Sequence, residues 1–134
     1  MATEEFRYLT IAEAVKFHIL YMRKIGETRI GVFDKNLIDS ALARPIQAAE
    51  YENADIHRQA ATLCFGLIKN HPWQGGNKRT ATFLTNLFLK RNGYKIFAQT
   101  SNLIELCLNV EADIWKVDEI ENWFRRHTRK INSF

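Results

Sequence analysis

The sequence has few residues that would cross-link or interrupt a fold. It has two cysteines, Cys64 and Cys107, and two prolines in 134 residues. The cysteines lie in separate apolar segments and form no CxxC pair, so we expect buried, reduced thiols. This excludes a disulfide framework and is typical of a cytosolic protein. We therefore predict a cytoplasmic location.

The sequence also lacks a long apolar run and a strong excess of charge. No run approaches the roughly 18 apolar residues of a membrane helix, and the first ten residues, with Glu4, Glu5 and Arg7, do not resemble a signal peptide. Lys plus Arg number 19 against 15 Asp plus Glu, a formal net charge of +4. A balance this modest suits a phosphate-bearing ligand, an acidic partner or an ordinary surface. We expect neither a membrane partner nor direct nucleic-acid binding.

The chain has enough apolar material for one core. Hydrophobic residues make up 46% of it, and this length suits a single domain spanning residues 1–134. Apolar periodicity with capping and stop residues predicts six helices, at about 11–25, 34–43, 55–69, 77–92, 101–110 and 119–127. We expect Arg44-Pro45 to end the second helix and a short hairpin to follow at 45–54. The predicted fold is all-α, a compact bundle of about six helices with a short flap hairpin.

The segment richest in chemistry is HPWQGGNKRTA, residues 71–81. Gly75 and Gly76 precede a helix start, where free N–H groups and the helix dipole attract an anion. Lys78 and Arg79 add two cations there, and His71 can exchange a proton near neutral pH. Each residue alone has an ordinary structural explanation. The whole group predicts a phosphate site beside a general base, and it is not a P-loop, since GxxxxGK[ST] is absent.

This segment resembles the signature of the Fic/Doc family, which reads His-x-Phe-x-Asp/Glu/Asn-Gly/Ala-Asn-Gly/Lys-Arg. The matching positions are His71, Gly76, Asn77, Lys78 and Arg79, with Trp73 in the aromatic position. The resemblance extends over about residues 10–98 and includes His18, residues 42–45 and residues 90–94. A lysine at position 78 resembles the Doc (death on curing) toxins of type II toxin-antitoxin systems, whereas AMP-transferring Fic proteins usually carry glycine there.

The resemblance implies an enzyme that transfers a phosphoryl group from ATP to a hydroxyl of a translation protein, elongation factor Tu in the family. His71 would deprotonate that hydroxyl, and Lys78 and Arg79 would neutralise the transferring group. Asn77 and the amides of Gly75 and Gly76 would hold the phosphates. Trp73 would anchor the loop, the 45–54 flap would dock the target's backbone, and an antitoxin partner would restrain the enzyme.

The sequence departs from the signature at Gly75, where the family carries a carboxylate or an amide that holds Mg²⁺. We therefore assign no metal-ligating residue and leave Mg²⁺ open beside ATP. Phosphates and water alone can hold the ion, a carboxylate such as Glu50 or Glu52 can reach in, or nucleotide can bind without turnover. If the lost ligand limits activity, we expect an aspartate at position 75 to raise it.

The same residues are compatible with three other functions. One is AMP transfer, a second is an RNA-cleaving toxin that uses His71, Lys78 and Arg79, and a third is a catalytically inactive Fic-like binding module. His18 lies on an apolar helix face, so we interpret it as a packed core histidine.

Overall fold

The structure, a computed structural model, describes residues 5–131. These residues form six helices and two short strands. The bounds are α1 Ile11–Lys24, α2 Lys35–Glu52, α3 Ile56–Asn70, α4 Asn77–Arg91, β1 Tyr94–Ile96, α5 Thr100–Glu111, α6 Val117–His127 and β2 Thr128–Lys130. The all-α fold predicted from the sequence is confirmed. None of the described helices combines the length and hydropathy of a membrane span.

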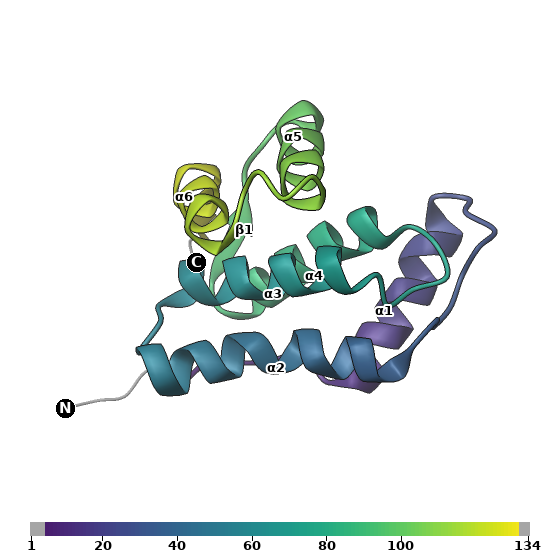
Figure 1. Ribbon diagram of the computed structural model, residues 1–134, viewed down its shortest axis with the longest axis horizontal. Helices are drawn as coiled ribbons and strands as arrows, with labels where there is room; N and C mark the ends of the chain where they lie inside the picture. The colour runs from purple at the N-terminus through teal and green to yellow at the C-terminus, as the bar shows by residue number, and fades with distance from the viewer. Residues whose placement is uncertain (1–4, 132–134) are drawn as a thin grey trace.

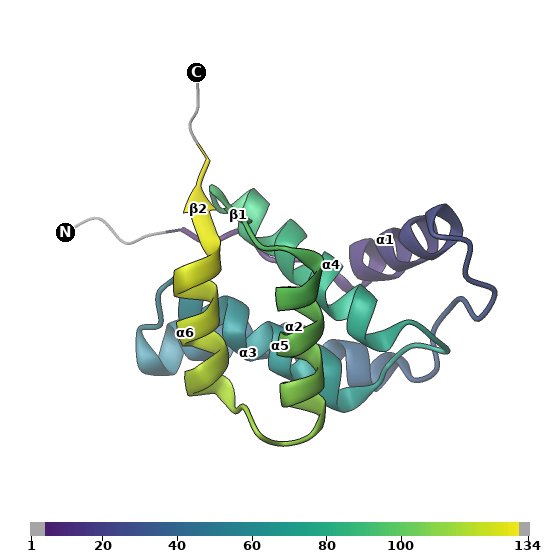
Figure 2. The ribbon, with the colours of Figure 1, turned by 90° about the horizontal axis from the view of Figure 1, so that it is seen from above.

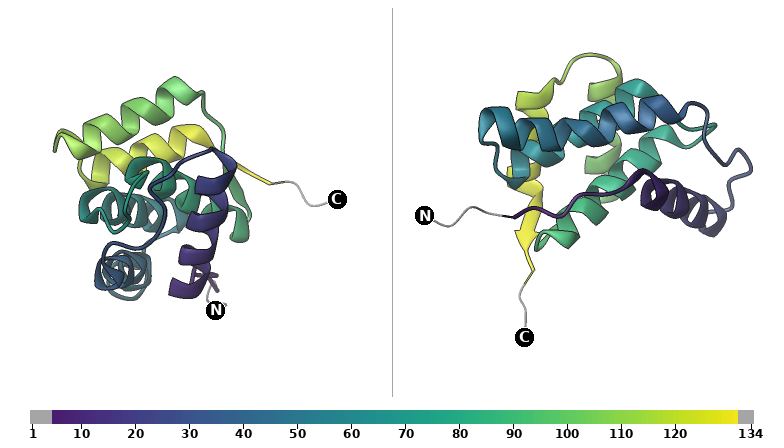
Figure 3. Two further views of the ribbon diagram at one scale, coloured as in Figure 1. Left: turned by 90° about the vertical axis from the view of Figure 1, so that its right-hand side faces the viewer. Right: turned by 90° about the horizontal axis from the view of Figure 1, so that it is seen from below.

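The helices stack in three layers (Figure 1 and Figure 3, left). Helices α3 and α4 form the middle layer, with α2 and α1 on one face. On the other face α5 and α6 lie side by side and run across α3 (Figure 2). Helix α3 thus contacts α2, α4, α5 and α6.

Helix α3 is buried over most of its middle, Gln59–Ile68, because it lies between these layers. Its start is capped by Asp55, whose side chain accepts a hydrogen bond from the Arg58 N–H at 3.0 Å. Ala60 and Ala61 are fully buried, and residues this small let neighbouring helices pack closely. The helix ends at Asn70, so His71 follows it directly into the loop before α4.

Helix α2 corrects the predicted break at Arg44-Pro45. It continues through Pro45 to Glu52, and Asn53 ends it in the left-handed conformation with φ 52°. A proline inside a helix costs about 3 kcal/mol, but the continuation of the helix past Ala43 buries Pro45 and Ala48. Covering the apolar face of α3 outweighs the local preference of the proline.

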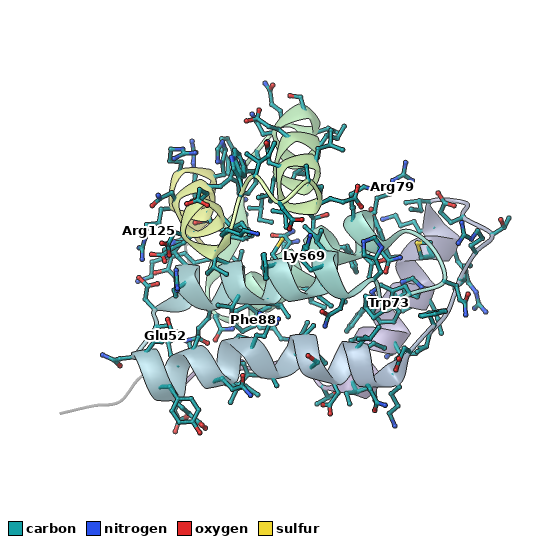
Figure 4. All side chains as sticks on the ribbon, viewed as in Figure 1. Glu52, Lys69, Trp73, Arg79, Phe88 and Arg125 are labelled. Atoms are coloured by element: carbon teal, nitrogen blue, oxygen red, sulfur yellow. The ribbon has the colours of Figure 1, made fainter. Side chains whose placement is uncertain are left out.

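The predicted flap hairpin at 45–54 was therefore wrong, because those residues are mainly the second half of α2. Glu52 pairs instead with Arg58 at 3.4 Å. Figure 4 places Glu52 at the opposite end of α2 from Trp73 and Arg79. A carboxylate from this end of α2 does not reach the loop at residues 71–76.

The two strands of the structure are β1 and β2, which pair antiparallel with Tyr94 opposite Lys130 and Ile96 opposite Thr128. Strand β1 lies between the helices predicted at 77–92 and 101–110. Strand β2 follows the helix predicted at 119–127 and was not predicted. This pairing fastens the end of α6 beside the end of α4.

Candidate functional site

The loop at residues 71–76 connects α3 to α4 with a sharp change of direction. His71 ends α3 in the left-handed conformation, with φ 50° and ψ 55°, and Pro72 prevents the helix from continuing. At the other end of the loop, Gly76 is also left-handed, with φ 64°. This conformation favours glycine, and a Cβ at Gly76 would also lie 2.6 Å from the Met22 thioether, which would have to shift.

The start of α4 is open to a ligand. Gly76 has no side chain with which to cap the helix, and Arg79 at the first turn is exposed. The N–H groups of this turn are therefore available to an anion.

Asn77 closes the loop with its side chain. Its Oδ1 accepts a hydrogen bond from the Trp73 N–H at 3.0 Å, and its Nδ2 donates to the Trp73 carbonyl at 3.1 Å. The side-chain amide is thus engaged with the loop itself. Only the backbone N–H of Asn77 remains for the predicted contact with phosphate.

Two buried aromatic rings, those of Trp73 and His18, pack against each other beneath the surface of the loop. Trp73 is 2% exposed and stacks on His18 at 4.1 Å between ring centroids. His18 Nε2 accepts a hydrogen bond from the Gly31 N–H at 3.1 Å, which leaves the proton on Nδ1 to be donated to Thr80 Oγ1 at 2.9 Å. Burial lowers the pKa of His18 to about 4. The interpretation of His18 as a core residue is confirmed.

Residues 26–33 run along the loop, and we name them the covering segment. The Gly31 carbonyl accepts a hydrogen bond from the Gln74 N–H at 2.9 Å, and Val32 forms an antiparallel bridge with Trp73. The Arg29 guanidinium donates to the Gln74 carbonyl at 2.7 Å. Sequence reasoning missed this segment because its partners lie more than 40 residues away along the chain.

The loop, the covering segment and the start of α4 line an open cavity of about 290 Å³. The cavity is lined by Glu27, Arg29, His71, Gln74, Gly75, Gly76, Asn77, Lys78 and Arg79. All the residues that the sequence predicted for the site therefore line one cavity. The imidazole of His71 borders the same space as the glycines and the two cations.

Carboxylates hold two of the cavity's cations. Lys78 Nζ lies 3.1 and 3.2 Å from the two oxygens of Glu111, the last residue of α5. His71 Nε2 is 3.7 Å from the same carboxylate. Arg79 pairs with Glu27 at 3.2 Å. Partly exposed ion pairs of this kind are weak, so a polyphosphate can displace the carboxylates.

A protein-bound Mg²⁺ does not fit the side chains at this cavity. Gly75 offers no ligand, and a Cβ there would lie 2.8 Å from the Arg29 carbonyl oxygen. Glu27 and Glu111 are both engaged with cations. Within residues 5–131 no group of three or more His, Cys, Asp or Glu side chains is placed to hold a metal. The expected benefit of an aspartate at position 75 conflicts with this packing.

A second cavity of about 410 Å³ adjoins the first between α4 and α5. It shares Lys78 and Arg79 with the first cavity, and its other lining residues include Tyr21, Leu103 and Ile104. The site therefore continues from a cationic pocket into a more apolar groove.

Comparison with known proteins identifies relatives that share this region. A family model described as "Fic/DOC family" matches residues 8–89, a span that includes the loop and nearly all of α4. The protein named "Protein kinase doc" of Escherichia phage P1 is 25% identical over 121 residues. The alignment covers 90% of this chain and 94% of the phage protein.

Proposed function

Because the chain belongs to the Fic/DOC family, we propose that it is a Doc-like toxin that transfers the γ-phosphoryl group of ATP to a hydroxyl of a translation protein. The name of the phage relative, a protein kinase, supports this class of reaction. The observation that carries the proposal is the shared cavity of His71, Lys78, Arg79 and the glycine amides. Elongation factor Tu is the target implied by the resemblance, and a cognate antitoxin is the implied partner.

The start of α4 binds the phosphates in this proposal. The N–H groups of its first turn donate to phosphate oxygens, and the helix dipole adds a partial positive charge. Lys78 and Arg79 exchange their carboxylate partners, Glu111 and Glu27, for phosphate oxygens. Placing donors and cations where charge develops is the main source of catalysis in phosphoryl transfer.

His71 removes the proton from the target hydroxyl. The oxygen of the target hydroxyl then forms a bond to the γ-phosphorus. The bond from that phosphorus to the bridging oxygen breaks, and ADP leaves. His71 is suited to this role because its half-exposed side chain lies at the edge of the cavity. A base here must reach the hydroxyl from the solvent side, where a protein target approaches.

The covering segment is our candidate for docking the target chain. It already pairs with the loop through the Val32 bridge to Trp73, and it contributes Glu27 and Arg29 to the cavity. An extended segment beside a reaction site can align a bound peptide by backbone hydrogen bonds. This assigns to residues 26–33 the role that the sequence interpretation gave to residues 45–54.

The test uses ATP labelled at the γ or the α phosphate, the purified protein and a bacterial translation extract. We expect label only from the γ position on a protein, reduced at least about 100-fold in His71→Ala. The control His127→Ala changes a half-buried histidine on α6, outside the cavity, and should keep the activity.

Other outcomes identify the rivals. Label from the α position would show AMP transfer instead. RNA degradation without ATP would indicate a ribonuclease. No label from either position would favour the binding module, which the missing ligand at Gly75 supports.

A further inference from the structure

We propose that Arg29 supplies the positive charge that a divalent cation would otherwise bring, so that this site binds a polyphosphate without Mg²⁺. The inference rests on the proposed function, because it concerns the same cavity. Gly75 is in close contact with the backbone of the covering segment at Arg29.

No ligating side chain can stand at position 75 without moving the covering segment. A Cβ there would meet both the Cβ and the carbonyl oxygen of Arg29 at 2.8 Å. The carbonyl belongs to the backbone, and that backbone is held by the hydrogen bond from Gln74 to Gly31 at 2.9 Å. The space of a metal-holding side chain is thus filled by residue 29 itself.

The Arg29 side chain is exposed and lines the cavity. One terminal nitrogen donates a hydrogen bond of 2.7 Å to the carbonyl of Gln74, which is the residue before Gly75. A guanidinium has five N–H donors, so most of them remain for a ligand. Its planar fork binds phosphate oxygens in pairs, which a single ammonium group does not.

Arg29 also differs from the other cations of the cavity in its partners. Lys78 pairs with Glu111 and Arg79 with Glu27. In the part of the chain that the structure describes, Arg29 forms no ion pair with a carboxylate within 4.0 Å. A phosphate therefore displaces no carboxylate when it binds Arg29.

The charges at the cavity favour an anion over a divalent cation. Arg29, Lys78 and Arg79 line it, and Glu27 and Glu111 already face two of these three cations. Mg²⁺ binds through oxygen ligands and usually requires one or two carboxylates. A nearby guanidinium repels such an ion and attracts the oxygens that would have held it.

The test measures binding of ATP and of inorganic tripolyphosphate by calorimetry, in MgCl₂ and in EDTA. The wild-type protein should bind each ligand in EDTA within about three-fold of its affinity in MgCl₂. Arg29→Gln retains a donor for the Gln74 carbonyl and removes the charge, and it should weaken binding in EDTA about ten-fold. Arg29→Lys, which keeps the charge, should lose less affinity in EDTA than Arg29→Gln does.

The control Arg126→Ala changes an exposed arginine on α6, away from the cavity, and should leave binding unchanged. Wild-type binding that appears only with MgCl₂ would overturn the inference and leave the proposed function standing. Unchanged binding by Arg29→Gln in EDTA would also overturn it. Failure of the wild-type protein to bind either ligand in both buffers would remove the proposed function as well.

Discussion

Glu111 contacts two residues on which the proposed reaction depends. Its carboxylate lies 3.1 Å from Lys78 Nζ and 3.7 Å from His71 Nε2. It therefore occupies positions that phosphate oxygens would take, and nucleotide binding includes the cost of displacing it. Because Lys78 and Glu111 are both more than a third exposed, solvent screening keeps that cost small.

Replacing Glu111 with Gln should strengthen ATP binding about three-fold at low salt, because the competing charge is lost. The gain should shrink as salt screens the remaining charges. Calorimetry at two salt concentrations checks both effects. Glu105→Gln is the matched control, an exposed glutamate on the same helix. Weaker binding by Glu111→Gln would mean that the carboxylate aligns Lys78 rather than competing with the ligand.

The elements around the loop depend on a close backbone contact between Gly75 and Arg29. The covering segment can follow the loop only because position 75 has no Cβ. A new side chain there would push the segment away and carry Arg29 with it. The contact therefore links the shape of the cavity to the position of one of its cations.

Gly75→Ala and Gly75→Asp test this contact together, since both add the same Cβ. Each should lower the free energy of unfolding by about 1–3 kcal/mol and weaken ATP binding. Urea unfolding and calorimetry measure the two effects. Should Gly75→Asp instead bind ATP more tightly in MgCl₂ than Gly75→Ala does, the carboxylate would be holding a metal ion, against our interpretation.

Local signals in the sequence predicted most helices closely. They failed where contacts between residues distant in the sequence determine where an element forms or ends. Thr10 and Glu13 form a capping box at the start of α1, with hydrogen bonds of 3.0 and 3.1 Å, and such a pair is visible in the sequence. Pro45 misled because its cost is local, whereas the benefit of continuing α2 comes from α3. Strand β2 has only three residues, too few to show a period.

The candidate site was predictable to the same extent. The residues of 71–79 are adjacent in sequence, so their cluster is visible there. Glu27 and Arg29 line the cavity from the covering segment, and Glu111 contacts Lys78 from α5, across separations of 33 to 52 residues. Their charges are unremarkable in the sequence, and only the packing of α5 and the covering segment brings them next to the loop and the start of α4.

At the scale of the whole molecule, the site and the core share the same supports. The middle layer of α3 and α4 contacts both outer layers, and the loop between these two helices forms the site. His18 connects α1 to α4 through Thr80 and to the covering segment through Gly31. Since its ring is 0% exposed and stacked on Trp73, charging it would disturb the core and the site together.

This arrangement predicts how stability depends on pH. Burial lowers the pKa of His18 from 6.5 to about 4, so the unfolded chain takes up a proton that the folded chain refuses. Stability is therefore full above pH 6.5 and falls as the pH drops from there toward 4, by about 3 kcal/mol from this group. Burial also lowers the pKa of His57, which adds a loss of the same sign.

Acidic groups affect stability at lower pH than the histidines do. The hydrogen bond from Arg91 lowers the pKa of Glu13 from 4.5 to about 2, so its contribution is lost only below pH 4.5. Urea midpoints followed by circular dichroism at pH 7, 5, 4 and 3 separate the two ranges. His18→Gln should be less stable at pH 7 and should show a much smaller fall between pH 7 and 4, whereas His57→Gln should retain most of it. An unchanged fall in His18→Gln would show that the link between α1, α4 and the covering segment tolerates a charged imidazole.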